Sequence, residues 1–306
     1  MSTRALDLLD LPTLHRYRNE ALGFDATRAV TRGNPLGAMG LMAYIDPTRH
    51  MYAAICDDGN RPSLLGGVFQ ARGETFAKLL YLAPVSRLED PALPALLENL
   101  AAEAGAWGAF QVIAEVDENC PAFPSLREAG FSVYAWQRMW DVSEFTGSED
   151  AEGWQRASSI HLPGIQSLYQ QIVPPLLQPV EQMPRQPAGF ICSEDFKCYI
   201  SYSSGPYGIA LHPLIHPEAT RVRDKLFALV SQLPNRRNRR VYVCVRSYQA
   251  WLENVLADLG GSAGPRQAVM VKHLARLVKD EQAVRAQQPA GVSVQPSRVS
   301  RIEPKK

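Results

Sequence analysis

The stretch NCPAFPSLREAGFSVYAWQRMW, Asn119–Trp140, follows an apolar segment and decides the fold. It predicts a short helix that ends at Gly130, where a positive φ is easiest, after which Phe131 returns the chain to the core. The β-branched and aromatic residues of Ser132–Val142 predict a strand directly afterwards. A strand, a helix and a second strand in close succession are typical of an α/β domain.

The same pattern occurs twice in the chain. Tyr81–Val116 aligns without a gap on Ala210–Val245, with a constant offset of 129 residues. Each copy predicts a strand, a proline-marked loop, an amphipathic helix and an apolar strand. The openings, Asp10–Tyr17 and His161–Tyr169, also match, because each predicts a helix with proline in its first turn. The apolar positions at helical spacing are Leu93, Leu96, Leu97 and Leu100 in the first copy and Val222, Leu226, Leu229 and Val230 in the second. The repeat therefore predicts two copies of one α/β domain.

Changes in composition mark the ends of the two copies. Ser143–Trp154 is short, polar and contains glycine, so it predicts a linker. From about Lys279 the apolar periodicity is lost while Gln, Pro, Ser and Arg become frequent, which predicts disorder. We therefore predict a first domain at 1–145, a degenerate second domain at 146–278 and a disordered tail at 279–306.

The overall composition argues against several classes of protein. The 306 residues carry a net charge of +1, so no global field favours nucleic acid or an anionic membrane. No apolar run approaches the roughly 20 residues of a membrane span. The N-terminus has no apolar signal core, so we expect a cytoplasmic protein. Five cysteines without paired spacing favour buried thiols over disulfides or a metal site.

On these residues the first copy resembles the GNAT family of N-acetyltransferases, over about Leu64–Trp140. The family's last strand–helix–strand unit has a spacing of Asn, Ala, Tyr and Gly-Phe that is matched here by Asn119, Ala122, Leu126, Gly130 and Phe131. The resemblance implies an α/β (α+β) fold with two tandem domains, each a mixed, mostly antiparallel twisted sheet flanked by helices. It also implies acetyl-CoA as co-substrate. One position differs, because Leu126 stands where the family often has a tyrosine that can protonate the departing thiolate.

The family's acyl-CoA loop has a partial counterpart after the fourth strand of the first copy. In the family, backbone amides of this loop and a helix N-terminus hold the pyrophosphate. Arg87 and Ala92 fit the pattern, but Asp90 replaces the central glycine and Glu89 adds a second negative charge, which opposes phosphate binding. The corresponding positions of the second copy are His216, Ala219 and Arg221. The cofactor-binding positions that the resemblance implies are Leu82, Val85, Arg87, Leu88, Glu89, Asp90, Ala92 and Asn119.

An active member of this family transfers the acyl group directly to an amine, so it needs a base for the amine and an acid for the thiolate. The candidate bases are Glu115 and Asp117, with Glu74 as a third, and the candidate acids are Tyr81, Tyr134 and Cys120. Each of these residues also has an ordinary structural interpretation, as a solvated carboxylate, a packed aromatic ring or an inert thiol.

Two functional classes follow. The spacing from Asn119 to Phe131, with Arg87, favours an acyl-CoA-dependent N-acyltransferase that acts on a small-molecule or peptide amine. The departures at Asp90 and Leu126 favour a catalytically inactive tandem protein that binds a ligand or a partner. Tandem copies imply either a monomer with an internal pseudo-dimer or a homodimer.

Two further segments invite functional interpretation. The basic run NRRNRR, Asn235–Arg240, has no interleaved aromatic residues to stack on bases, so we predict a solvated turn and no nucleic-acid partner. The proline-rich segment Ile172–Pro187 predicts a rigid connector that covers the sheet, with a substrate-side lid or a docking segment as the alternatives.

Overall fold

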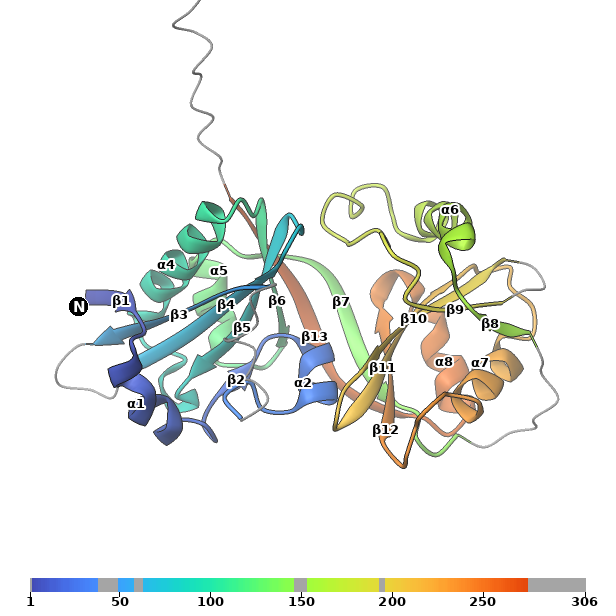
Figure 1. Ribbon diagram of the computed structural model, residues 1–306, viewed down its shortest axis with the longest axis horizontal. Coiled ribbons are helices and arrows are strands. Elements are labelled where there is room, and N and C mark those ends of the chain that lie inside the picture. Colours follow the sequence, from blue (N-terminus) through green and yellow to red (C-terminus); the bar gives the residue numbers. More distant parts are fainter. Residues whose placement is uncertain (1, 38–48, 58–62, 146–152, 193–195, 275–306) are drawn as a thin grey trace, which may run out of the picture. The chain divides into compact units, whose positions relative to one another are not determined.

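The computed structural model describes residues 2–37, 49–57, 63–145, 153–192 and 196–274 (Figure 1). Residues up to Ala275 form one compact unit. The predicted tail at 279–306 lies outside the described residues, as does 146–152 of the predicted linker. The domain boundaries therefore stay predictions. Below, the first half is the chain up to Phe145 and the second half begins at Gly153.

The first half contains the predicted amphipathic helix and the final strand–helix–strand unit. Its strands are β1 (Ser2–Ala5), β2 (Leu22–Gly23), β3 (Arg49–Asp57), β4 (Leu64–Ala71), β5 (Phe76–Ala83), β6 (Gln111–Asp117) and β7 (Ser132–Asp141). Its helices are α1 (Leu11–Arg16), α2 (Ala26–Arg32), α4 (Leu93–Ala106) and α5 (Ala122–Glu128), with 3-10 turns η1 (Leu8–Asp10) and η3 (Val85–Arg87). Both α1 and α4 have proline in the first turn, where the missing N–H costs no helical hydrogen bond.

The second half repeats this order with a longer opening helix. Its strands are β8 (Trp154–Arg156), β9 (Gly189–Cys192), β10 (Cys198–Ser204), β11 (Gly208–Ile215), β12 (Arg240–Arg246) and β13 (Ser262–His273). Its helices are α6 (Leu162–Ile172), α7 (Val222–Ser231) and α8 (Trp251–Asp258), with 3-10 turns η4 (Ser159–His161) and η5 (Ser247–Gln249). The predicted repeat of β5, α4 and β6 by β11, α7 and β12 is confirmed.

The two halves share one sheet because they exchange their last strands. Within the described ranges, thirteen strands form a sheet in which β13 lies between β6 and β7, and β7 in turn neighbours β12 (Figure 1). β13 therefore pairs antiparallel with β6 of the first half, and β7 pairs antiparallel with β12 of the second half. At the centre, Gln137 of β7 faces Gln267 of β13, and their side-chain amides hydrogen-bond at 3.0 Å. The predicted mixed, mostly antiparallel sheet is confirmed, and the exchange joins the two copies into one sheet.

Each half contains one parallel pair of strands, and in both halves the pair diverges. β5 pairs with β6 only over Phe76–Lys78, and β11 pairs with β12 only over Gly208–Leu211. Beyond these residues the strands continue without pairing to each other. We call the resulting openings the first wedge, beside Leu79–Ala83, and the second wedge, beside His212–Ile215.

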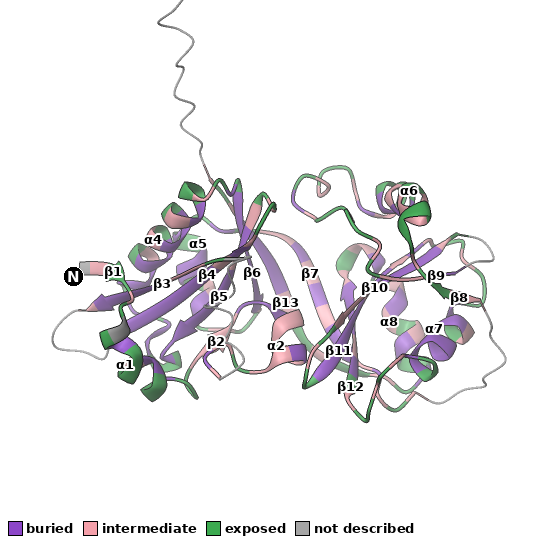
Figure 2. Cartoon of the chain, viewed as in Figure 1, coloured by how far each residue is buried: buried purple, intermediate pink, exposed green. Residues whose placement is uncertain are grey.

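The cores lie on the helix-covered face of each half. Val112, Ala114 and Val116 of β6 belong to the cluster beneath α4 and α5, and the leucines predicted on α4 are buried there. In the second half, Val243 and Val245 of β12 belong to the cluster beneath α7 and α8. Figure 2 shows that the central strands are largely buried along their length. Because side chains alternate along a strand, the intervening residues of β6 and β12 point to the opposite face.

The local predictions around the opening stretch are confirmed. Gly130 has φ of 82° and ends the turn after α5, and Phe131 is buried. β13 begins at Ser262, and an irregularity between Ala263 and Arg266 lets this strand pair with both ends of β7.

The basic run forms a turn between α7 and β12, as predicted. Within it Arg239 donates to the carbonyl oxygen of Gly205 at 2.6 Å, which ties the turn to the β10–β11 hairpin. In the part of the chain that the structure describes, no helix has the length and apolar character that a membrane span requires.

Close packing in β4 gives a test of the first core. A Cβ at Gly67 would collide with the ring of Tyr81 on β5, whereas one at Gly105 would lie 3.7 Å from Leu274, an ordinary contact. We therefore expect Gly67→Ala to lower the free energy of unfolding by about 1–3 kcal/mol through overpacking. Gly105→Ala, the matched control, should leave the free energy unchanged or raise it by up to about 1 kcal/mol. Denaturant unfolding measures both, and equal effects of the two substitutions would contradict the packing.

Candidate functional site

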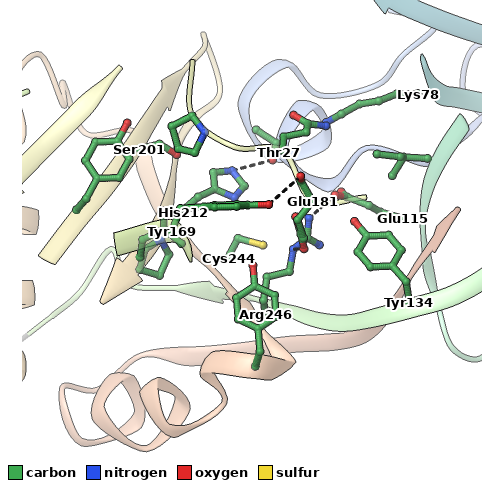
Figure 3. A pocket seen from close by; sticks show the side chains of 17 residues that line it. Thr27, Lys78, Glu115, Tyr134, Tyr169, Glu181, Ser201, His212, Cys244 and Arg246 are labelled. Atoms are coloured by element: carbon green, nitrogen blue, oxygen red, sulfur yellow. Dashed lines mark hydrogen bonds and ion pairs between the residues drawn. The ribbon is translucent and has the colours of Figure 1, made fainter. Parts of the chain in front are cut away.

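A cavity of about 260 Å³ lies on the face opposite the helix-covered cores, and both halves line it (Figure 3). The first half contributes Thr27 of α2, Lys78 of β5, Ile113 and Glu115 of β6, and Tyr134 of β7. The second half contributes Tyr169, Glu181, Gln182, Pro184, Tyr199, Ser201, His212, Pro213, Leu214, Cys244, Arg246 and Tyr248. We call this the central cavity. It reaches the second wedge, since it includes residues from both β11 and β12 beyond the point where they diverge.

Arg246 organises one wall of the central cavity. Its Nε lies 2.9 Å from Oε1 of Glu181, and its Nη2 lies 3.7 Å from Oε1 of Glu115. Its Nη1 donates to Oε1 of Gln137, the buried glutamine at the centre of the sheet. The Arg246 side chain is only 16% exposed, so these acceptors compensate a charge that burial makes costly. Figure 3 shows Arg246 extended toward Glu181 and Glu115.

A second ion pair lies on the opposite wall. Nζ of Lys78 is 3.0 Å from Oδ2 of Asp25, the N-cap of α2. Burial by itself lowers the pKa of Lys78, but the carboxylates of Asp25 and Glu115 outweigh it and raise the pKa above its ordinary value. Glu115 also accepts a hydrogen bond of 2.7 Å from the backbone N–H of Ala26. Counting Asp25, Glu115, Glu181, Lys78 and Arg246 as ionised gives this cluster a net charge of −1.

Four tyrosines supply aromatic surface and hydroxyl groups to the cavity. The Tyr169 hydroxyl donates to the carbonyl oxygen of Glu181 at 3.0 Å, which ties α6 to residues 173–188, here called the connecting segment. The hydroxyls of Tyr134, Tyr199 and Tyr248 form no hydrogen bond with any residue that the structure describes. Burial raises the pKa of all four hydroxyls, to about 12 for Tyr169. They are therefore neutral groups that can donate and accept.

His212 and Cys244 are buried and uncharged. Burial lowers the pKa of His212 to about 4, and the positive charges of Arg246 and Lys78 act in the same direction. Its Nε2 lies 3.0 Å from Oγ1 of Thr27, which links β11 to α2. Burial raises the pKa of Cys244 to about 12, and its thiol donates to Gln137. The lowered pKa makes His212 a weak base, and the raised pKa keeps Cys244 a thiol rather than a thiolate nucleophile at neutral pH.

The lowered pKa of His212 predicts a pH dependence of stability. In the unfolded chain His212 binds a proton near pH 6.5, whereas in the folded protein it does so only near pH 4. The unfolded state thus holds more protons between these values, so the stabilisation is present above pH 6.5 and is lost as the pH falls toward 4. The loss amounts to roughly 3 kcal/mol.

We expect His212→Asn to reduce this loss in chemical denaturation measured between pH 7 and 4.5. The Asp10 carboxyl, whose pKa Arg4 lowers to about 2, titrates in a separate, more acidic range and is unaffected by the substitution. Identical pH profiles of the wild type and His212→Asn would show that His212 is not buried as a neutral ring.

The structure separates the sequence-predicted catalytic candidates. Glu115 and Tyr134 both line the central cavity. Asp117, at the end of β6, does not line it, and Glu74 instead lies 3.6 Å from Arg185. The candidate acids Tyr81 and Cys120 are packing residues, because Tyr81 is fully buried and Cys120 packs against the first core. Leu126, which stands where the family often has tyrosine, is also fully buried. Burial raises the pKa of the Cys120 thiol.

In the loop where the resemblance places a phosphate, Arg87 and Asp90 neutralise each other's charge. Nε of Arg87 donates to Oδ2 of Asp90 at 3.1 Å, and both side chains are buried. The other carboxylate oxygen of Asp90 accepts from the backbone N–H of Ala92 at 2.9 Å, directly before α4. Asp90 therefore occupies the helix N-terminus where the resemblance places a phosphate. Leu88 is buried, whereas Glu89, Val85 and Asn119 are exposed.

Loss of the Asp90 charge tests this arrangement. Removing one partner of a buried ion pair leaves the other charge uncompensated, which costs about 3–5 kcal/mol. We expect Asp90→Asn to lower the free energy of unfolding by an amount near the lower end of that range, because the amide oxygen keeps the bond to Ala92. Glu89→Gln, next to it and exposed, is the matched control and should change stability by less than about 0.5 kcal/mol. If Asp90→Asn and Glu89→Gln both change the free energy of unfolding by similarly small amounts, the buried ion pair of Arg87 and Asp90 would be refuted.

The first wedge contains Leu82, one of the cofactor positions that the resemblance implies, but the chain itself occupies this wedge. We call Glu20–Ala26 the inserted segment. Its β2 pairs antiparallel with Tyr81 and Leu82, and Phe24 N–H donates to the Leu80 carbonyl oxygen at 3.0 Å. On the other side, Glu115 N–H donates to the Phe24 carbonyl oxygen at 2.9 Å, so the segment bridges β5 and β6.

Two further observations indicate that the first wedge has no room for acyl-CoA. The Val85 N–H, another position that the resemblance assigns to the cofactor, donates to the Glu20 carbonyl oxygen at 2.9 Å. Phe24 is 1% exposed and belongs to the first core, so the inserted segment is packed as firmly as the strands beside it. The backbone groups that would hold an acyl-CoA arm in the first half are thus already paired.

Sequence reasoning missed most of the central cavity. Arg246, His212 and Tyr248 lie in the copy where no family motif was found, and Glu181 lies in the connecting segment. One signal was present in the repeat, since Cys244 and Arg246 occupy the positions equivalent to Glu115 and Asp117. The connecting segment has neither helix nor strand from Val173 to Ala188, and it supplies Glu181, Gln182 and Pro184 to the lining.

Comparison with known proteins supports the fold. No family model matches the sequence, and no curated protein matches it either. Among solved structures, a GCN5-related N-acetyltransferase from Sphaerobacter thermophilus superposes with a TM-score of 0.52 at 12% identity, over 89% of this chain and 95% of that chain. A tandem GNAT protein from the clavulanic acid biosynthesis pathway superposes with a TM-score of 0.51 at 14% identity, over 90% of this chain and 99% of that chain.

At these identities the likeness concerns the fold alone. The chain has the fold of the GNAT N-acetyltransferases, in a tandem arrangement. The resemblance found in the sequence is confirmed at this level.

Proposed function

We propose that the protein binds a small polar molecule in the central cavity and that it is not an acyltransferase of the usual kind. The observation that carries the proposal is the set of tyrosine hydroxyls that face the cavity without partners among the described residues, beside the ion-paired Arg246. The hydroxyl oxygens are not among the buried unpartnered atoms, so they are accessible from the cavity and can form hydrogen bonds with a molecule that enters it.

The size and charge of the cavity restrict the ligand. A volume of about 260 Å³ is below the usual range for drug-sized ligands, so the ligand is small. The positive charges of Arg246 and Lys78 are engaged by carboxylates, and the cluster has a net negative charge. An anion would have to break these ion pairs, which disfavours it. The lining therefore suits a neutral or cationic molecule with several hydrogen-bonding groups.

Thermal unfolding with a panel of small amines, polyols and neutral amides tests the proposal. A ligand at about 100 times its Kd adds roughly 2.7 kcal/mol, which raises the midpoint by a few degrees. For each compound that raises it, Tyr134→Phe and Tyr248→Phe should weaken binding about 3- to 10-fold, because each removes one hydrogen bond. Tyr207→Phe, at an exposed tyrosine outside the cavity, is the matched control. If Tyr134→Phe and Tyr248→Phe bind such a compound as tightly as the wild type does, its binding site lies outside the central cavity.

The second candidate is an acyl-CoA-dependent N-acyltransferase that transfers an acetyl group from acetyl-CoA to a small-molecule or peptide amine. The observation in its favour is that Glu115 and Tyr134, candidate base and acid, both line a cavity that reaches the second wedge. Release of free CoA from acetyl-CoA in the presence of an amine panel measures this activity. Turnover that disappears in Glu115→Gln would replace the first proposal by the second.

Two properties of the whole protein remain proposals. One is a cytoplasmic location, which we propose from the sequence alone. The exchange of β7 and β13 within one chain supports a monomer with an internal pseudo-dimer, because it already pairs the strands that two copies would otherwise share.

A further inference from the structure

The second wedge contains a buried side-chain amide. Gln249 lies in η5, directly after β12, and is 1% exposed. Its Oε1 accepts from the backbone N–H of Ile215 at 2.9 Å, and its Nε2 donates to the carbonyl oxygen of Pro213 at 2.8 Å. One primary amide therefore forms two hydrogen bonds with the end of β11, as a neighbouring strand would.

These hydrogen bonds lie on the wedge side of β11. The next residue, His216, directs its N–H to the Lys197 carbonyl oxygen, just before β10. Successive residues of a strand point their backbone groups to opposite edges, so the Ile215 N–H points away from β10 and toward the side of β12. Gln249 thus pairs the edge of β11 that is left open where β11 and β12 diverge.

The loop that follows β11 is also internally paired. The ring Nδ1 of His216 accepts from the Glu218 N–H at 3.2 Å, and Nε of Arg221 lies 3.2 Å from Oδ2 of Asp224. These are the second-copy positions at which side chains would have to neutralise a phosphate. Arg221 is directed to a carboxylate of the first turn of α7 instead.

We infer that Gln249 closes the end of the second wedge at Pro213 and Ile215 by pairing the backbone groups that an amide of the acyl-CoA arm would need, so that neither half holds acyl-CoA in the way the resemblance implies. The two halves reach the same result by different means. In the first wedge a backbone segment with a core phenylalanine fills the space, whereas in the second a single side chain does so. The inference concerns this wedge alone and does not depend on which molecule the central cavity binds.

The difference between the halves predicts what one substitution can do. Shortening Gln249 to alanine frees the Ile215 N–H and the Pro213 carbonyl oxygen and empties the space beside them. Gln249→Met also removes both hydrogen bonds but keeps the wedge filled. It therefore separates the effect of losing the hydrogen bonds from the effect of emptying the wedge. Gln171→Ala, at an exposed glutamine of α6, is the control for a glutamine-to-alanine change elsewhere.

The experiment is calorimetric titration of the wild type and these variants with pantetheine, CoA and acetyl-CoA. Hydrogen exchange of the peptide that contains Ile215 is followed in parallel. We expect no saturable binding by the wild type, Gln249→Met or Gln171→Ala, and unchanged protection of Ile215 in the wild type. Gln249→Ala should bind pantetheine or CoA saturably, at least tenfold more tightly than the weakest affinity that the wild-type titration could detect. Its midpoint of unfolding should be lowered and then partly restored by the ligand.

Two outcomes would overturn the inference. Saturable binding of acetyl-CoA by the wild type, with altered exchange at Ile215, would show that Gln249 does not close the wedge. A folded Gln249→Ala that gains no affinity would show that something else closes it. If Gln249→Ala does not fold, the wild-type titration and the exchange measurement still decide. Loss of binding to the central cavity would affect neither result.

Discussion

The pairing of β7 with β13 at the centre of the sheet is the constraint on which the rest of the structure depends. Because these strands are exchanged, β6 and β12 each receive a partner from the other copy, and the two halves become one sheet. Gln137 connects this seam to the cavity, since it bonds Gln267 and also accepts from Arg246 and Cys244. The orientation of Arg246, and with it the charged wall of the central cavity, thus follows from the exchange.

The same architecture creates two wedges, and a protein of this fold must fill them or leave them to a ligand. Unpaired backbone N–H and C=O groups in a protein interior are costly, so each open strand edge needs partners. The inserted segment supplies them to β5, and Gln249 supplies them to the end of β11. What stays open is the central cavity, where uncharged hydroxyls and ion pairs from both halves converge. A binding function in that cavity is compatible with these pairings, because Gln249 pairs the end of β11 and does not itself line the cavity, although the cavity reaches the second wedge.

The sequence predicted the local elements well because their determinants are local. The repeat, the helix at Leu93–Leu100 and the turn at Gly130 depend on neighbouring residues. Of the site, it predicted Glu115 and Tyr134 as candidates but not Arg246, His212 or Glu181. Those residues acquire a role only when segments far apart in the chain meet, and their spacing carries no motif.

The sequence by itself determined that the chain contains two copies of one α/β unit, because apolar periodicity and helix-breaking residues are encoded within each copy. It also showed the altered positions Asp90 and Leu126. Only the tertiary structure decided that Asp90 neutralises Arg87, that the copies exchange strands, and that Phe24 and Gln249 occupy the wedges. A segment can pair with many strand edges that have similar local preferences. Packing of the whole chain decides which of these edges it pairs with.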